Sequence, residues 1–242
     1  MRATLFVTCL GDQFFADACA DSIELLGSLG VEVDVARGQT CCGQPAYNAG
    51  RWPEARSMAS HTLEVLADAE YVVVLSGSCT AMIRRGYEDL YGGGAAVVPG
   101  AADLAGRPFE LAEFIVGVLG VEDVGSGLAG RTVAYHHGCH APRELGVREQ
   151  PLTLLENAGA ELVQWEAAEE CCGFGGLFSA KLPEVAAAMA DRKLDTLPDP
   201  DIVTSADPGC LLHLSGRAAG RGGGPVFRHV ASLLWEAANG RS

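Results

Sequence analysis

Eight of the nine cysteines form two copies of one spacing pattern. The first copy is Cys9, Cys41-Cys42-Gly43 and Cys79, and the second is Cys139, Cys171-Cys172-Gly173 and Cys210. In both copies 31 residues separate the first cysteine from the pair, and 36 or 37 residues separate the pair from the last cysteine. This repeat indicates an internal duplication. Because thiolates bind soft and borderline metals, each set of four is a candidate ligand set for an iron–sulfur cluster or for zinc.

The adjacent cysteines in each copy favour a cluster over zinc. Zinc sites usually draw on compact Cys-x-x-Cys motifs, which the sequence lacks, whereas neighbouring thiolates can bind different irons of one cluster. Zinc in one or both halves stays an alternative, and disulfides are disfavoured because neighbouring cysteines seldom bridge. Gly43 and Gly173 fit a close approach of backbone to an inorganic core. Cys19 lies outside the repeat, and we interpret it as a buried core thiol.

The sequence resembles a known family in both copies. The repeated Cys…Cys-Cys-Gly…Cys pattern resembles the CCG cysteine-rich domain, and segments 41–50 and 171–179 resemble the lactate utilization protein A family. More distant similarity runs to the CCG-containing subunit of heterodisulfide reductase and to the iron–sulfur subunit of glycolate oxidase. The resemblance implies a [4Fe-4S] cluster in each half, bound by the eight cysteines. It also implies a role in passing electrons out of L-lactate or another 2-hydroxy acid, with other iron–sulfur or redox subunits as partners.

The sequence departs from the fuller family pattern at one position in each copy. That pattern ends in Cys-x-x-Cys, but here the first of the two cysteines is replaced by Ser76 and by Asp207. The departure weakens the alternative of a heterodisulfide-type thiol–disulfide reductase, and a zinc-stabilised scaffold subunit is a third interpretation. Asp207 is either an extra ligand or a loop residue bonded to its own backbone, and Ser76 is more simply a small loop residue. His140 is a candidate hydrogen-bond donor to cluster sulfur, and the catalytic residues are unknown.

The elements that must position these thiols alternate between strands and helices. Strands are predicted at 3–8, 31–35, 71–75, 132–136, 161–165 and 202–204, and helices at 14–29, 55–69, 81–90, 108–119, 151–157, 183–194 and 227–238. The fold class is therefore α/β, with two tandem pseudo-repeated halves (1–125 and 126–242), each a mostly parallel sheet flanked by helices. The cysteines follow strand ends, where open parallel sheets bind ligands, so we expect four thiols to converge in each half.

Composition excludes several classes of function. The net charge is −14 and the isoelectric point is about 4.7, which disfavours nucleic acid and anionic membranes as partners. The N-terminal apolar run is too short for a signal peptide, and no apolar stretch approaches the roughly 18 residues that span a bilayer. We expect a cytoplasmic protein without a transmembrane segment, in a compartment that keeps thiols reduced. No P-loop, dinucleotide fingerprint or nucleophile elbow is present in the sequence.

Overall fold

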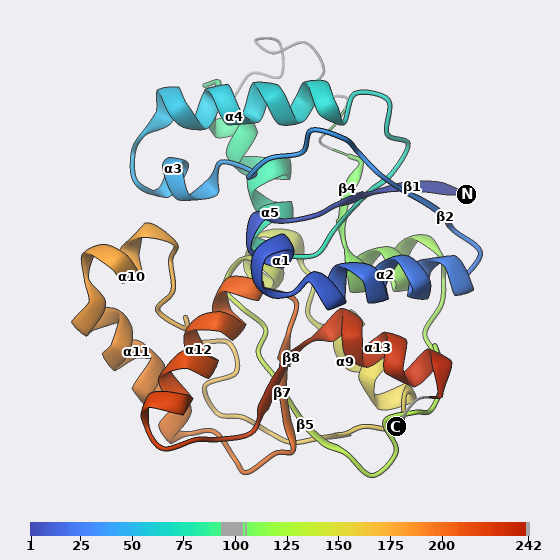
Figure 1. The fold of residues 1–242 in the computed structure, drawn as a ribbon, viewed down its shortest axis with the longest axis vertical. Helices are drawn as coiled ribbons and strands as arrows, with labels where there is room; N and C mark the ends of the chain where they lie inside the picture. Colours follow the sequence, from blue (N-terminus) through green and yellow to red (C-terminus); the bar gives the residue numbers. More distant parts are fainter. Residues whose placement is uncertain (93–103, 105, 241–242) are drawn as a thin grey trace.

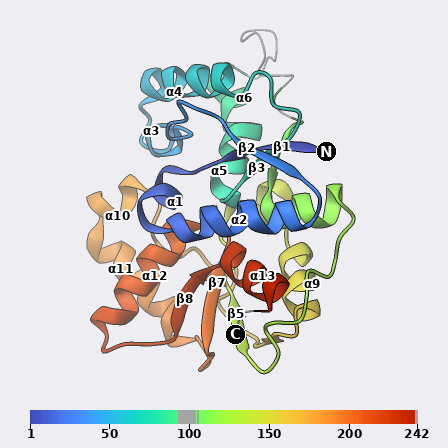
Figure 2. The same cartoon turned by 45° about the vertical axis from the view of Figure 1, so that its right-hand side comes forward.

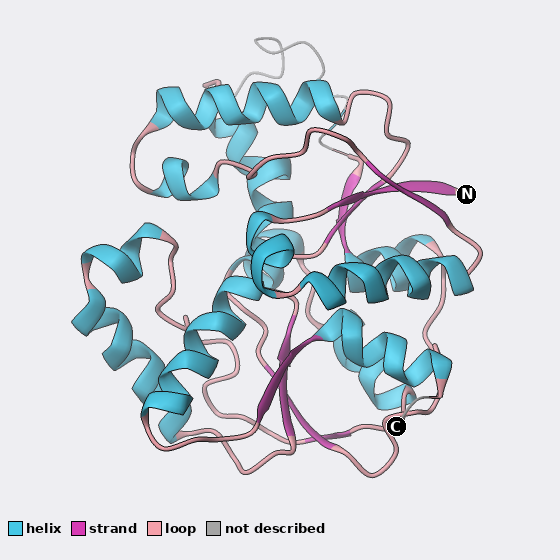
Figure 3. Cartoon of the chain, in the orientation of Figure 1, coloured by secondary structure: helices cyan, strands magenta, loops and turns pink. Residues whose placement is uncertain are grey.

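Two four-stranded parallel sheets, one in each half of the chain and each flanked by helices, make up the protein (Figure 3). The computed structural model describes residues 1–92, 104 and 106–240. The strand orders are β2-β1-β3-β4 and β6-β5-β7-β8, so the two sheets repeat one topology. The predicted α/β class with two pseudo-repeated halves is confirmed.

The first sheet and its helices come from the first half of the chain. Its strands are β1 (Arg2–Phe6), β2 (Glu32–Val35), β3 (Val72–Val74) and β4 (Pro108–Glu110). Its helices are α1 (Cys9–Phe14), α2 (Ala16–Ser28), α3 (Gln44–Asn48), α4 (Trp52–Val65), α5 (Gly77–Ala81), α6 (Tyr87–Leu90) and α8 (Leu111–Glu113), with π-helical turns η1 (Met82–Gly86) and η2 (Phe114–Val118).

The second half repeats this order with small changes of length. Its strands are β5 (Thr132–Tyr135), β6 (Glu161–Leu162), β7 (Ile202–Ser205) and β8 (Val226–His229). Its helices are α9 (Glu149–Asn157), α10 (Leu177–Lys181), α11 (Pro183–Asp195), α12 (Pro208–Gly220) and α13 (Val230–Asn239), with the π-helical turn η3 (Ala141–Leu145).

Each sheet has one strand more than the sequence predicts. The predicted helices 108–119 and 227–238 were wrong at their starts, because their first residues form the edge strands β4 and β8. Glu110 and His229 each end a strand and also cap the helix that follows, accepting hydrogen bonds from backbone N–H groups of its first turn. Because no loop separates strand from helix, the pattern of apolar residues in the sequence does not show where the strand ends and the helix begins.

The two halves pack against each other through helices and share a core. Helix α2 lies beside α13 in two views (Figures 1 and 2), α1 packs on α12, and α5 packs on η3. One apolar cluster takes Leu25, Phe114, Leu154 and Leu233 from both halves. This packing brings the carboxyl ends of both sheets towards the same region. Across the described residues, we find no helix with the length and apolar character needed to cross a membrane.

Candidate metal centre

The sheet topology places two cysteines of each set side by side. Cys9 is the first residue of α1, just after β1, and Cys79 lies in α5, just after β3. These strands are neighbours, with β2 on one side and β4 on the other, so the connections diverge between them and leave a crevice at their carboxyl ends. Cys139 and Cys210 follow β5 and β7 in the same way. The predicted convergence of thiols at the strand ends is therefore present in both halves.

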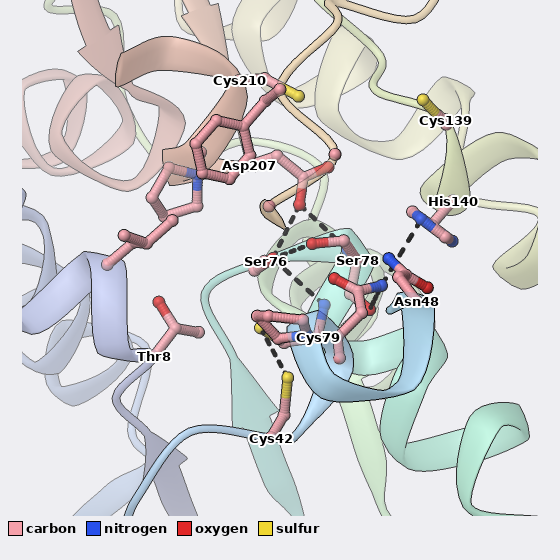
Figure 4. Close-up of a pocket in the computed structure, with 18 of the residues that line it drawn as sticks. Thr8, Cys42, Asn48, Ser76, Ser78, Cys79, Cys139, His140, Asp207 and Cys210 are labelled. Atoms are coloured by element: carbon pink, nitrogen blue, oxygen red, sulfur yellow. Dashed lines mark hydrogen bonds between the residues drawn. The ribbon is translucent and has the colours of Figure 1, made fainter. Parts of the chain in front are cut away.

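Both sets line a single cavity between the two halves. The cavity has a volume of about 180 Å³, and its walls include all eight cysteines of the repeat. The side chains of Cys42 and Cys79 lie on one side of it, and those of Cys139 and Cys210 on the other (Figure 4). The sequence predicted two separate convergences, but it carried no signal that the two sets would face each other.

The four thiols of the first half contact one another in a chain. The Cys42 thiol donates to the sulfur of Cys79 over 3.3 Å. Hydrogen bonds from the thiols of Cys42 and Cys9 lower the pKa of Cys41 to about 3. The same bonds to Cys41 raise the pKa values of Cys9 and Cys42, and burial raises both further. The charge of this set is therefore most stable on Cys41.

The second half repeats this arrangement. The Cys172 thiol lies 3.0 Å from the sulfur of Cys210. Hydrogen bonds from the thiols of Cys139 and Cys172 lower the pKa of Cys171 to about 2. Such sets of contacting thiols suit a soft or borderline metal, whose binding would displace the remaining thiol protons. The clustered cysteines therefore point to metal binding in both halves.

The glycine after each cysteine pair has a local structural role. Gly43 and Gly173 adopt left-handed backbone angles, with φ of 88° and 89°. A Cβ atom on Gly173 would lie 2.6 Å from the backbone oxygen of Ala186, and one on Gly43 would lie 3.4 Å from that of Ala55. The glycines thus let the loop turn against α11 and α4.

Asp207 and Ser76 join the two halves at the edge of the cavity (Figure 4). The Ser76 hydroxyl donates to Asp207 Oδ1 over 2.7 Å, and the backbone N–H of Ser78 donates to the same oxygen over 2.9 Å. Asp207 directly precedes α12, but its side chain accepts no capping hydrogen bond from that helix. The interpretation of Asp207 as a loop residue bonded to its own backbone was therefore wrong, and Ser76 has a partner in the other half.

His140 lines the cavity, but its ring is committed to other partners. Nδ1 is bonded to the carboxylate of Glu144, and Nε2 lies 3.5 Å from the side-chain nitrogen of Gln44. Gln44 Nε2 in turn donates to the carbonyl oxygen of Ser78 over 3.1 Å. In this arrangement His140 helps to connect the two halves. Cys19, in contrast, is buried in the shared core, as its position in a helix predicted.

A buried histidine beside the second set was not singled out from the sequence. His136 is fully buried, and burial lowers its pKa to about 3, so the ring is neutral. Its Nδ1 lies 3.0 Å from the carbonyl oxygen of Ala168. A ring nitrogen of His136 and the sulfur atoms of Cys172 and Cys210 lie within 4.8 Å of one another. The sequence feature that could have identified His136 is its position at the end of a strand, three residues before Cys139.

A buried lysine below the second set was also missed. The ammonium group of Lys193 lies 4.2 Å from the centre of the Trp165 ring and donates to the carbonyl oxygen of Ala167. Burial lowers the pKa of Lys193 to about 8, while charge interactions with Cys172, Cys210 and Glu170 raise it. Its burial could have been predicted from helical periodicity, because Lys193 lies on the same buried face of α11 as Ala186 and Ala190.

Comparisons with known proteins agree with the duplicated pattern. The family of the cysteine-rich domain CCG matches residues 3–84 and 133–215. Lactate utilization protein A of Geobacillus thermodenitrificans (strain NG80-2) is 44% identical over 238 residues, which cover 97% of this chain and 98% of that protein. Lactate utilization protein A 2 of Bacillus cereus (strain 03BB102) is 36% identical over 242 residues, covering 99% and 100%.

A solved structure with some likeness is glutamate racemase from Thermus thermophilus in complex with β-chloro-D-alanine. The TM-score is 0.37 at 15% identity, and the match covers 97% of this chain and 77% of that one. A likeness this low carries no argument about fold or function.

Proposed function

This chain belongs to the lactate utilization protein A family, with two CCG cysteine-rich domains, and we propose that it is an iron–sulfur electron-transfer subunit of an L-lactate oxidation system. The observation that carries the proposal is the pair of four-thiol sets on one cavity. A [4Fe-4S] cluster takes four thiolates, so each half would hold one cluster. The ligands would be Cys9, Cys41, Cys42 and Cys79 in the first half, and Cys139, Cys171, Cys172 and Cys210 in the second.

The residues around the thiols fit such a group. Cys210 lies in the first turn of the 13-residue helix α12, whose N-terminal end faces the negative charge that a bound cluster would bring. Cys42 and Cys172 are each only 2% exposed, and Leu10 and Phe174 add apolar walls to the cavity. Bound clusters supply one-electron transfer, with potentials set by hydrogen bonds and exposure. The chain's own contribution is to hold both thiol sets on one cavity.

The relatives' name supplies the substrate class of the proposal. Electrons would leave L-lactate or another 2-hydroxy acid on partner subunits and reach further iron–sulfur or redox subunits through this chain. We place the system in the cytoplasm, where thiols stay reduced. The nine cysteines are free thiols, which suits that placement.

The first test is the content of iron, zinc and acid-labile sulfide per chain in protein purified without oxygen. About eight irons with matching sulfide would support two four-iron clusters. Four irons with one zinc would indicate that one half binds a cluster and the other binds a structural zinc. Zinc near two, without iron, would overturn the redox proposal and favour a zinc-stabilised scaffold.

A second test addresses lactate. The tagged chain is purified with its partners, and L-lactate is added without oxygen while cluster absorbance is followed. Bleaching by L-lactate, but not by acetate, supports the proposal. Iron-loaded protein that is bleached by dithionite and never by L-lactate would exclude the lactate link while leaving the clusters.

A further inference from the structure

The two thiol sets are alike, but the residues behind them are not. Strands β1 and β5 occupy the same place in their sheets, and Phe6 and His136 are equivalent residues at their ends, each three residues before the first cysteine of its set. Both side chains are buried, with exposures of 1% and 0%. Phe6 packs in the apolar cluster that contains Cys42. The second half therefore has an imidazole where the first half has only hydrocarbon.

The two ring nitrogens of His136 are in different situations. Nδ1 is 3.0 Å from the carbonyl oxygen of Ala168, an acceptor, so Nδ1 carries the proton. Nε2 then presents a lone pair, and it is buried with no hydrogen-bond partner among the residues that the structure describes. Leaving a buried polar atom unpaired is costly, so such an atom in a fold calls for an explanation.

The surroundings of that lone pair are those of a metal ligand. A ring nitrogen of His136 and the sulfurs of Cys172 and Cys210 lie within 4.8 Å of one another, and the two sulfurs are 3.0 Å apart. Ligand atoms on one tetrahedral zinc or iron lie about 3.5 Å apart, so small side-chain shifts would suffice. Histidines that bind metals usually donate their other N–H to a carbonyl or carboxylate, as His136 does to Ala168.

We propose that His136 is a metal ligand through Nε2, forming with Cys172 and Cys210 a mixed nitrogen–sulfur set for iron or zinc in the second half. The first half then offers sulfur alone, and where the imidazole replaces one of the four thiolates the second site carries one negative charge fewer. A neutral imidazole donor raises the reduction potential of an iron centre relative to thiolate alone. The higher reduction potential would make the second half the electron-accepting side. Only this redox consequence rests on the proposed function; the metal ligation by His136 does not.

Cobalt(II) tests the ligand without iron. The full chain is stripped of metal under reducing conditions and titrated with Co²⁺, whose visible bands report the donor atoms. His136→Phe copies the residue of the first half and keeps the bulk of the ring, and His136→Gln checks that the effect is not one of packing. Both should shift the bands of one of the two bound ions towards an all-sulfur spectrum and weaken its binding about tenfold or more. His137→Ala, at the neighbouring half-buried ring, is the matched control.

Pulsed electron paramagnetic resonance of the reduced holoprotein gives the second measurement. With ¹⁵N-labelled histidine, we expect a strongly coupled nitrogen that disappears in His136→Phe and stays in His137→Ala. Unchanged cobalt spectra in both His136 variants, or an iron-loaded protein without a coupled nitrogen, would overturn the inference and leave the proposed function standing. Absence of iron combined with a His136-dependent cobalt spectrum would overturn the proposed function and leave the inference about His136 standing.

Discussion

The hydroxyl of Ser76 donates a hydrogen bond to Oδ1 of Asp207 over 2.7 Å, and the two residues are 131 positions apart, the same offset as Cys79 and Cys210. They are therefore equivalent residues of the two halves, bonded to each other in the wall of the cavity. Both are buried, with exposures of 2% and 4%. In the fuller family pattern these positions hold thiols. Here they join the halves.

This bond predicts thermodynamic coupling between the two positions. Ser76→Ala and Asp207→Ala should each destabilise the chain, because each leaves a buried polar partner unpaired. The double variant should lose less than the sum of the two, with a coupling of about 1–2 kcal/mol in denaturant unfolding. Additive losses would contradict the bond. Metal content should stay unchanged in Asp207→Ala, and loss of metal would instead identify the carboxylate as a ligand.

The separation of the two thiol sets predicts that each loses its metal independently. Cys172→Ala should remove the metal of the second half and leave that of the first, so that metal per chain falls to about one half. Cys42→Ala should do the converse. Cys19→Ala is the matched control, since Cys19 is buried in the shared core and outside both sets. It should cost about 1 kcal/mol of stability and no metal. Equal metal content in Cys172→Ala and the parent would disprove the assignment.

Much of this architecture is predictable because it depends on local signals. The cysteine repeat and the alternation of strand and helix give the class of the fold and place Cys9 and Cys79 at strand ends. These inferences need only spacing and the rule that parallel sheets bind ligands at one edge. The short strand before Glu110 escaped prediction because it runs directly into a helix.

The packing of the two halves against each other could not be predicted from the sequence. The contact of Ser76 with Asp207 and the shared cavity depend on how two sheets pack, and spacing along the chain carries no information on that. His136 and Lys193 were missed for a related reason. A histidine at a strand end and a lysine in a helix usually face solvent or a core partner, and only burial beside the thiols distinguishes them.

The buried ammonium of Lys193 predicts a stabilising substitution. Burial lowers its pKa from 10.5 to about 8, so the charged form is held at a cost at neutral pH. Since the folded pKa lies below the unfolded one, stability should rise with pH between about 8 and 10.5. Lys193→Met should raise the stability of the metal-free chain at pH 7 by roughly 1–3 kcal/mol and remove that rise.

A second measurement on Lys193→Met is the reduction potential of the holoprotein. Loss of a nearby positive charge should lower the reduction potential of a second-half centre and leave the first-half centre unchanged. Arg192→Met, at the neighbouring exposed residue, is the matched control and should change neither stability nor potential appreciably. A less stable Lys193→Met chain at pH 7 would show that the contact with Trp165 outweighs the cost of burial.

Glu110 predicts a pH dependence of opposite sign. The carboxyl group is 1% exposed, Oε1 has no hydrogen-bond partner among the described residues, and burial raises the pKa from 4.5 to about 8. The folded chain thus binds a proton that the unfolded chain has lost, so this group's stabilisation is complete below pH 4.5 and decreases as pH rises to about 8. At about 1.4 kcal/mol per pKa unit, the decrease between pH 4.5 and pH 8 amounts to at most about 5 kcal/mol.

Glu110→Gln should remove this decrease while keeping the cap. The amide oxygen can still accept from the backbone N–H of Ala112 and Glu113, as the carboxylate oxygen does at 2.8 and 3.2 Å. Denaturant unfolding of the metal-free chain at pH 5, 6, 7 and 8 should therefore give a flatter profile for the variant than for the parent. Glu54→Gln, at an exposed glutamate paired with Arg51, is the matched control and should keep the parent slope. Parallel profiles for Glu110→Gln and the parent would mean that Glu110 is already ionised at pH 5, with its charge stabilised by the cap.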